Sequence, residues 1–237
     1  MIGAATVEDG VLTLCCSSLD SGRLFWTDPD GTRHGYEVEA AEAVAAEAGL
    51  DLRWIFRRWS DFRPSLERRE CDAIWCGSAI TPERRTVFAY TQPYAVFDES
   101  IVVRPGSDVH EAGDLVGLRV LAIDGSTNMA LAQTFPGAVP VPFSGDTDDV
   151  LGDMLALLRR GEVDALVDDD VCFIEPDPTL RVAFTVPTRN AWGGACRTGD
   201  TALVALLDGA MAAVDFRPLW ERWLSALPCP FTRRGPA

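Results

Sequence analysis

Lysine is absent from this chain of 237 residues, so all 21 basic residues are arginine. The absence excludes Schiff-base chemistry on a lysine and a nucleotide-binding P-loop, whose lysine contacts phosphates. Imidazoles are scarce, with only His34 and His110, and the seven cysteines form no Cys-x-x-Cys pair. We therefore expect no structural metal site and no cofactor. Reduced thiols are the simplest account of the cysteines.

Long apolar runs are also missing. No run reaches the length of about 18 residues that a transmembrane helix needs, so no transmembrane segment is expected. Residues 1–10 lack the basic and apolar regions of a secretory signal. These features predict a cytoplasmic location for the chain as given, or a periplasmic or extracellular one if a signal has been removed. The net charge of −15 repels phosphate backbones, so nucleic acid is not an expected partner.

Short apolar runs alternate with segments of helical periodicity along the chain. Strands are predicted at residues 11–15, 52–56, 71–75, 100–103, 118–123, 164–167 and 181–186. Helices are predicted at 38–48, 60–69, 81–84 onward, from about 127 onward, at 149–160 and 200–214, and around 220–224. This alternation is typical of βαβ units, and it occurs in two blocks. The sequence therefore predicts an α/β fold of two Rossmann-like lobes with mostly parallel sheets. Lobe 1 is expected at 11–96 and 192–227, lobe 2 at 97–191, and a loose C-terminal tail at 228–237, with a hinge near 95–100 and 187–192.

A series of motifs runs through the chain in a fixed order. The longest is Trp59-x4-Pro64-Ser-Leu66-x5-Asp72-Ala-Ile74-x2-Gly77-x2-Ile80-Thr81-x2-Arg84. The others are Gly31-x3-Gly35-Tyr36-Glu-Val-Glu39, Tyr90-Thr91-x-Pro93-Tyr94, Gly125-Ser-Thr127, Gly161-x-Val163-Asp164-Ala165-x3-Asp169 and Trp192-Gly193-x-Ala195. Over residues 11–224 the chain resembles the amino-acid-binding solute-binding proteins of ABC importers, family 3. The resemblance implies a type 2 periplasmic binding protein-like fold with a ligand cleft between its lobes.

Residues within these motifs suit an α-amino acid, which carries a carboxylate and an ammonium group close together. Arg84 can hold a carboxylate through two parallel charge-assisted hydrogen bonds. Backbone N–H groups at Thr127 and Asn128 open a predicted helix and favour anions. Asp169, at the carboxyl end of a predicted strand, can accept the ammonium group.

The predicted site also includes an aromatic residue and a glycine. Trp59 offers a flat apolar face for a ligand side chain, and Gly77 belongs to the same motif as Arg84. The resemblance assigns Trp59, Arg84, Thr127 and Asp169 to these roles. Two features depart from the family pattern: the first loop, residues 18–24, lacks the usual aromatic lid, and Ala79 stands where a hydroxyl residue is usual.

Two functions from different classes follow. The first is a solute-binding protein that closes on a small amino acid or related carboxylate, with an ABC permease as partner if the protein is exported. The alternative is a cytosolic enzyme, dehydratase-like or lyase-like, because Trp59, Arg84 and Thr127-Asn128 also resemble cyclohexadienyl dehydratases. That family's general acid is replaced here by Cys172 and its lysine has no counterpart, so no catalytic residue is assigned. Glu99, Asp169 and Cys172 are the acid–base candidates. A cytosolic sensor or a degenerate binder is a third possibility.

Overall fold

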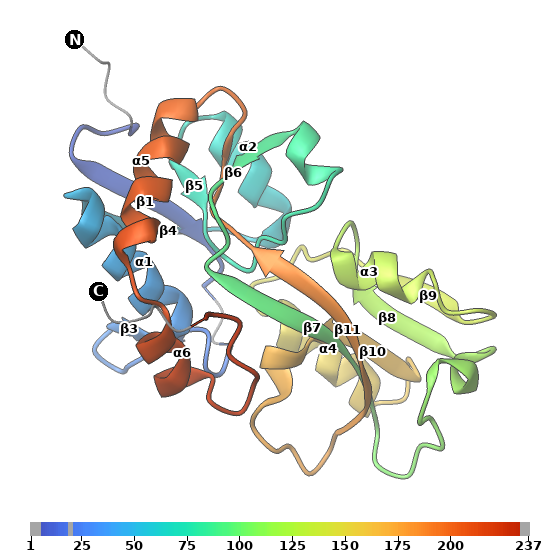
Figure 1. Ribbon diagram of the computed structural model, residues 1–237. Coiled ribbons are helices and arrows are strands. Elements are labelled where there is room, and N and C mark those ends of the chain that lie inside the picture. Colours follow the sequence, from blue (N-terminus) through green and yellow to red (C-terminus); the bar gives the residue numbers. More distant parts are fainter. Residues whose placement is uncertain (1–5, 19–20, 233–237) are drawn as a thin grey trace. The chain divides into compact units, whose positions relative to one another are not determined.

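The computed structural model describes residues 6–18 and 21–232, and the chain divides into two compact units (Figure 1). The first unit takes in the described residues of Met1–Arg57, Asp61–Val96 and Asn190–Ala237, and the second takes in Arg58–Ser60 and Phe97–Arg189. Each unit has its own five-stranded sheet and its own helices.

The sheet of the first unit has the strand order β4-β1-β5-β12-β6. Its strands are β1 (Val11–Cys16), β4 (Asp51–Phe56), β5 (Ala73–Ile74), β6 (Phe88–Tyr90) and β12 (Ala195–Arg197). β1 pairs in parallel with β4 and β5, whereas β12 pairs antiparallel with β5 and β6. β1 is the centre of the parallel part, and its residues Leu12 and Leu14 are completely buried. This placement explains why its sequence is a continuous apolar run rather than an alternating one.

Helices cover this sheet. They are α1 (Tyr36–Ala48), α2 (Phe62–Glu67), α5 (Thr201–Ala213) and α6 (Arg217–Trp223), with the 3-10 turn η2 (Arg84–Thr86) in the same unit. The 3-10 turn η1 (Trp59–Asp61) precedes α2, and its first two residues are counted with the second unit. α1 packs against α5 and α6, and α2 packs against β1 and β5. α1 ends at Gly49, whose φ of 68° is the left-handed conformation that glycine adopts most easily. A small antiparallel pair, β2 (Trp26–Thr27) and β3 (Arg33–His34), precedes α1.

The sheet of the second unit has the order β11-β7-β10-β8-β9. Its elements are β7 (Ala95–Val103), η3 (Ala112–Leu115), β8 (Arg119–Ile123), α3 (Thr127–Ala132), β9 (Val139–Phe143), α4 (Val150–Arg159), β10 (Ala165–Asp169), η4 (Asp170–Phe173) and β11 (Arg181–Trp192). β8 pairs in parallel with β9 and β10, and β7 pairs antiparallel with β10. Apolar residues of these strands form a core with α3, among them Ile101, Val120, Val167 and Met129.

The predicted α/β fold with two mostly parallel sheets is confirmed, although single elements differ. The sequence did not indicate β9, because Pro140 and Pro142 weaken a strand pattern; β9 lies at the sheet edge, where proline is tolerated. The helix predicted from Thr81 is only the 3-10 turn η2, although the Thr81 hydroxyl does accept the Arg84 N–H at 3.1 Å. Asp200 precedes α5 as expected but makes no capping bond, because its carboxylate pairs with Arg197 at 2.5 Å.

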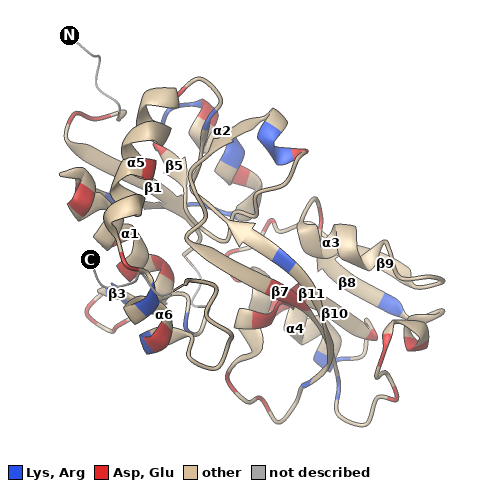
Figure 2. Ribbon diagram, viewed as in Figure 1, with Lys and Arg blue, Asp and Glu red and all other residues tan. Residues whose placement is uncertain are grey.

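Parts of two predicted features lie outside the described residues: Leu19 and Asp20 of the first loop, and 233–237 of the tail. In the described part of the tail, Phe231 packs against the rings of Phe216 and Trp220. Within residues 6–18 and 21–232, no helix combines the length and apolar character needed to cross a bilayer. Arginine and acidic residues are interspersed along the ribbon of each unit (Figure 2), and many form exposed pairs such as Arg63 with Glu67.

Candidate functional site

Three predicted site positions of the second unit lie at one edge of its sheet. β8, β9 and β10 are neighbouring parallel strands, so their carboxyl ends share an edge. Thr127 and Asn128 begin α3 shortly after β8 ends, and Asp169 is the last residue of β10. Open α/β sheets bind ligands beyond the carboxyl ends of their strands. The topology therefore brings these residues to the edge where such a site is expected.

Trp59 belongs to the second compact unit, and its side chain packs against the segment that follows β9. Its side chain packs on Gly145, where an added Cβ would lie 3.1 Å from Trp59 Cδ1. The adjacent Arg58 pairs with Asp146 at 3.2 Å and Asp148 at 2.9 Å. Residues 145–148 follow the carboxyl end of β9, so the indole lies at the same edge as Asp169. Trp59 itself is half-buried, which leaves part of the ring accessible.

Asn128 is the most informative side chain of this edge. Its residue is 5% exposed, and its Nδ2 has no hydrogen-bond partner within the described part of the chain. A buried amide donor left without an acceptor destabilises a fold by about 1–3 kcal/mol. The neighbouring Ser126 caps α3 by accepting the Met129 N–H at 3.0 Å, so the hydroxyl of Thr127 is not needed as the cap. A bound acceptor would satisfy the Asn128 amide.

Acidic groups gather on β10 and β7 beside this position. In the antiparallel register Asp169 faces Glu99 of β7, and Glu99 is 1% exposed. Burial, followed by the charge of Glu99, raises the pKa of Asp168 to about 6, although the Asp169 N–H donates to its Oδ1 at 2.8 Å. Buried carboxylates need positive partners. The second unit can therefore favour a cationic group at the end of β10.

The first unit carries Gly77 and Arg84 on the segment that follows β5. Arg84 is half-buried, and its Nη1 donates to the Ala79 carbonyl at 3.3 Å. Together with the bond from its N–H to Thr81, this contact fixes the guanidinium relative to the loop. A guanidinium has five N–H donors, so one anchored donor is compatible with a carboxylate held by others.

Gly77 is required by the geometry of the same loop. Its φ is 59°, and an added Cβ would lie 3.2 Å from the ring of Trp192. Its N–H donates to Oε1 of Glu37 at 2.9 Å. The N–H of Gly77 is therefore satisfied by the protein itself, and the residue shapes the loop through its lack of a side chain.

Glu37 is a buried carboxyl that the sequence predictions missed. It is 0% exposed, and the Tyr94 hydroxyl donates to both of its oxygens, at 3.1 and 2.9 Å. Burial, reinforced by the negative charge of the Cys76 thiolate, raises its pKa to about 8, so the carboxyl is protonated near neutral pH. The only sequence signal was its place in the Gly35-Tyr36-Glu-Val-Glu39 motif.

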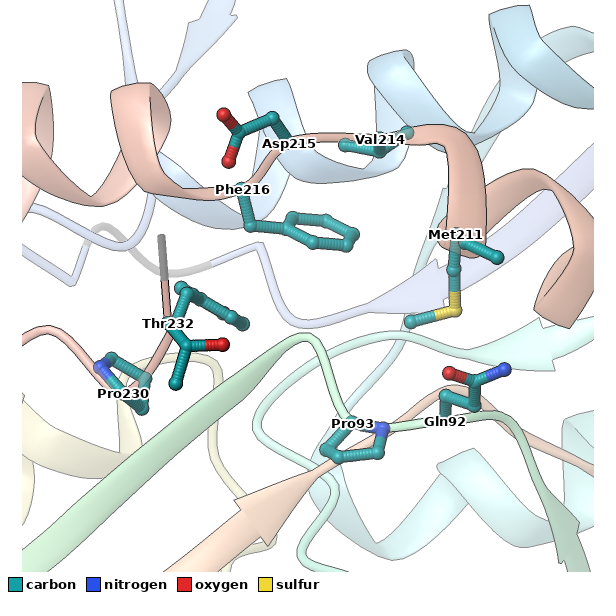
Figure 3. A pocket seen from close by; sticks show the side chains of 10 residues that line it. Gln92, Pro93, Met211, Val214, Asp215, Phe216, Pro230 and Thr232 are labelled. Carbon is teal, nitrogen blue, oxygen red and sulfur yellow. The ribbon is translucent and has the colours of Figure 1, made fainter. Parts of the chain in front are cut away.

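Two pockets lie away from these residues, one in each unit. The first has a volume of about 310 Å³ and lies between α5, α6 and the tail; in Figure 3 the Phe216 ring and the Met211 side chain extend into it, whereas the Asp215 carboxylate points away. The second, of about 650 Å³, is lined mostly by apolar residues such as Leu155 and Val182, together with Cys172. Cys172 thus lies among apolar side chains. Across residues 6–18 and 21–232, no three histidine, cysteine, aspartate or glutamate side chains are grouped to hold a metal ion.

Comparison with known proteins agrees with the predicted resemblance. Residues 20–223 match the model of the bacterial extracellular solute-binding proteins, family 3. The L-arginine-binding protein of Pseudomonas aeruginosa is 27% identical over 215 residues, which are 83% of this chain and 82% of that protein. An L-cystine-binding protein of Escherichia coli is 26% identical over 209 residues, 83% of this chain and 76% of that protein.

Solved structures extend the similarity to the fold. The arginine-bound form of truncated ArgBP from T. maritima is 29% identical, with a TM-score of 0.76, and the match covers 87% of this chain and 97% of that one. An ancestral amino acid-binding protein, described as a precursor of cyclohexadienyl dehydratase, has a TM-score of 0.76 and 22% identity over 90% of this chain and 95% of that one. At this identity the second match bears on the fold alone.

Proposed function

Because the chain belongs to the bacterial extracellular solute-binding proteins of family 3, we propose that it is a receptor for a free α-amino acid. The relatives named above bind arginine and cystine, so amino acids of this kind are the first ligands to test. We further propose a periplasmic or extracellular location and an ABC permease as the partner that receives the ligand. Segments 95–100 and 187–192 are the proposed hinge.

The observation that carries the proposal is the buried amide of Asn128. Asn128, in the first turn of α3, is 5% exposed, and its buried Nδ2 has no acceptor from residues 6–18 or 21–232, which is a costly arrangement unless a ligand supplies one. A carboxylate oxygen is a strong acceptor for such a donor. The hydroxyl of Thr127, at the preceding position, adds a second donor of the same kind.

The ammonium group of the ligand is assigned to Asp169. This residue ends β10 beside the buried acids Asp168 and Glu99, which makes its surroundings negative. Amino acids differ from simple carboxylates by this ammonium group, so the acidic strand end supports an amino acid over a dicarboxylate. Trp59, packed on Gly145 at the same sheet edge, is proposed to cover the ligand side chain.

Arg84 of the first unit is the proposed carboxylate partner. Hydrogen bonds to a charged group contribute about 1.5–3 kcal/mol, so removal of the guanidinium should weaken binding by about 10-fold to 150-fold. Gly77 contributes by keeping the preceding loop close to Trp192.

The test is isothermal titration of the purified chain with the proteinogenic L-amino acids and L-cystine. Arg84→Ala is compared with Arg85→Ala, which removes the neighbouring, exposed guanidinium above the Tyr90 ring. We expect one or a few amino acids to bind, with affinity lost in Arg84→Ala and kept in Arg85→Ala. Equal affinity in the two variants would refute the role of Arg84, and no binding by any compound would refute the proposed function.

The enzyme alternative is tested in the same samples. Mass analysis of the ligand after incubation should recover it unchanged if the chain is a receptor. A product formed by wild-type protein, with chorismate and prephenate included as substrates, would favour the dehydratase-like alternative instead.

A further inference from the structure

Two pairs of cysteines join β1 to the segment around β5. The Cys15 thiol interacts with the Cys71 thiol, and the Cys16 thiol interacts with the Cys76 thiol. β1 and β5 are parallel neighbours, with Leu14 opposite Ala73 and Cys15 opposite Ile74. The Ser17 N–H donates to Cys76 Sγ at 3.5 Å, which places that sulfur against the residue that follows Cys16. Successive residues of a strand face opposite sides of a sheet, so the adjacent Cys15 and Cys16 reach different partners.

The two pairs differ in their access to solvent. Cys15 and Cys71 are both 0% exposed, whereas Cys76 is partly exposed beside the buried Cys16. The interaction with the Cys71 thiol, followed by burial, raises the pKa of Cys15, so this thiol stays protonated. A protonated, buried thiol is inert. Only the second pair includes a residue that is partly exposed.

The surroundings of Cys76 stabilise a thiolate. The Ser17 N–H donates to Cys76 Sγ at 3.5 Å, and the Ser17 hydroxyl lies at the same distance from that sulfur. The interaction with the Cys16 thiol, the bonds with Ser17 and the charge of Arg33 lower the pKa of Cys76 to about 7, against the opposing effect of burial. Glu37 also faces this sulfur, but its own raised pKa keeps it uncharged near neutral pH, so it does not repel the thiolate.

We propose that Cys76 is a site of reversible oxidation by hydroperoxides, with Cys16 as the resolving thiol. The Cys76 thiolate attacks one peroxide oxygen, the O–O bond breaks, and the leaving hydroxide takes up a proton to become water. The sulfur is oxidised by two electrons to a sulfenic acid, and the peroxide is reduced. The Cys16 thiol then displaces water from the sulfenic acid, giving a Cys16–Cys76 disulfide that an added dithiol returns to two thiols.

This inference is independent of the proposed amino-acid site, because it uses neither Arg84 nor any residue of the second unit. A Cys16–Cys76 disulfide would nevertheless affect the loop that carries Gly77. Cys76 directly precedes Gly77, and Cys16 ends β1, so the disulfide would tie the loop after β5 to the end of β1.

The experiment uses the full chain carrying Cys229→Ser, which removes an exposed thiol and so prevents disulfides between molecules. The reduced protein is treated with one equivalent of hydrogen peroxide, its remaining thiols are alkylated, and the protein is digested with trypsin. The chain has no lysine, so cleavage after arginine places Cys15 and Cys16 in the peptide of residues 1–23 and Cys71 and Cys76 in the peptide of residues 70–84. We expect these two peptides to become cross-linked, with the loss of two hydrogen atoms, and to separate on reduction.

Variants identify which sulfurs react. Cys15→Ala and Cys71→Ala should both keep the cross-link, since they alter only the buried pair. Cys76→Ala should abolish it. Cys16→Ala should also abolish it but leave a sulfenic acid on Cys76, which dimedone traps on the peptide of residues 70–84.

Alkylation kinetics give a second readout that needs no disulfide. The labelling rate of Cys76 in reduced protein should rise with pH around a midpoint near 7, which makes it about 10-fold faster at neutral pH than an ordinary cysteine thiol of the same accessibility. The proposal is overturned if the cross-link persists in Cys16→Ala or Cys76→Ala, or if peroxide leaves the two peptides separate. It is also overturned if dimedone labels another cysteine in place of Cys76.

Discussion

The buried carboxyl of Glu37 makes the stability of the first unit depend on pH in an unusual direction. In the folded chain its pKa is raised from 4.5 to about 8, mainly by burial, because the bonds from the Gly77 N–H and the Tyr94 hydroxyl only partly offset the desolvation. Between these two values the folded state holds a proton on this group that the unfolded state has already lost. The protonated Glu37 carboxyl therefore contributes its full share of the unfolding free energy below about pH 4.5, and this contribution is lost as the pH rises through 8.

The magnitude follows from the size of the shift. Each pH unit in this window removes about 1.4 kcal/mol of unfolding free energy, so the interval from 4.5 to about 8 corresponds to about 5 kcal/mol at most. Such a loss is comparable to the whole stability of many domains. Most carboxyls behave in the opposite way, since a lowered pKa contributes stability that is lost on acidification.

The substitution Glu37→Gln isolates this effect. The glutamine amide can still accept from the Gly77 N–H and can donate to the Tyr94 oxygen, but it has no proton to lose. Urea unfolding of both proteins should show the variant gaining about 4 kcal/mol relative to wild type between about pH 5 and pH 8. Glu47→Gln, at an exposed position of the same helix, is the matched control and should run parallel to wild type. A constant difference between Glu37→Gln and wild type across this range would refute the raised pKa.

Two further predictions concern packing. Gly77→Ala should destabilise the chain by about 1–2 kcal/mol, because the added Cβ meets the Trp192 ring at 3.2 Å with a backbone φ of 59°, whereas Gly199→Ala has nothing within 4 Å and should have little effect in thermal unfolding. Arg197→Met should cost about 3 kcal/mol in chemical denaturation, since the 13% exposed guanidinium holds an ion pair and two backbone carbonyls. Loss of the exposed pair in Arg63→Met should change stability by less than about 1 kcal/mol.

Most strands and helices could be predicted from the sequence, because they follow the hydrophobic periodicity of each element and the residue types typical of turns and helix caps. Val11–Cys16 is buried on both faces and reads as a continuous apolar run, and α4 begins at the residue whose side chain caps it, Asp149, which accepts the Gly152 N–H at 3.0 Å. The errors occurred where tertiary context overrides local preference. Pro140 and Pro142 are compatible with β9 only because it is an edge strand, and strand order is not encoded in any local pattern.

The site could be predicted only as separate positions. The sequence placed Thr127 and Asn128 after one strand and Asp169 at the end of another, but the order β10-β8-β9 is what sets them along one sheet edge with Trp59. The roles of these residues in ligand binding stay predictions. The proximity of Cys16 and Cys76 could not be predicted from the sequence for the same reason. The two residues lie on distant segments, which meet because β1 and β5 are neighbouring strands.

Burial explains why Glu37 was missed altogether. A glutamate in the first turn of a helix usually faces solvent and favours the helix dipole, so its local context predicts an ordinary surface charge. Here Tyr94, Gly77 and the neighbouring Cys76 come from segments 39 to 57 residues away and enclose the carboxyl. A group whose ionisation depends on such distant neighbours has no local sequence signal. Because the Glu37 carboxyl is protonated near neutral pH, it does not repel a thiolate at Cys76. The pH dependence of stability in Glu37→Gln and the labelling kinetics of Cys76 therefore test the same pair of neighbouring groups.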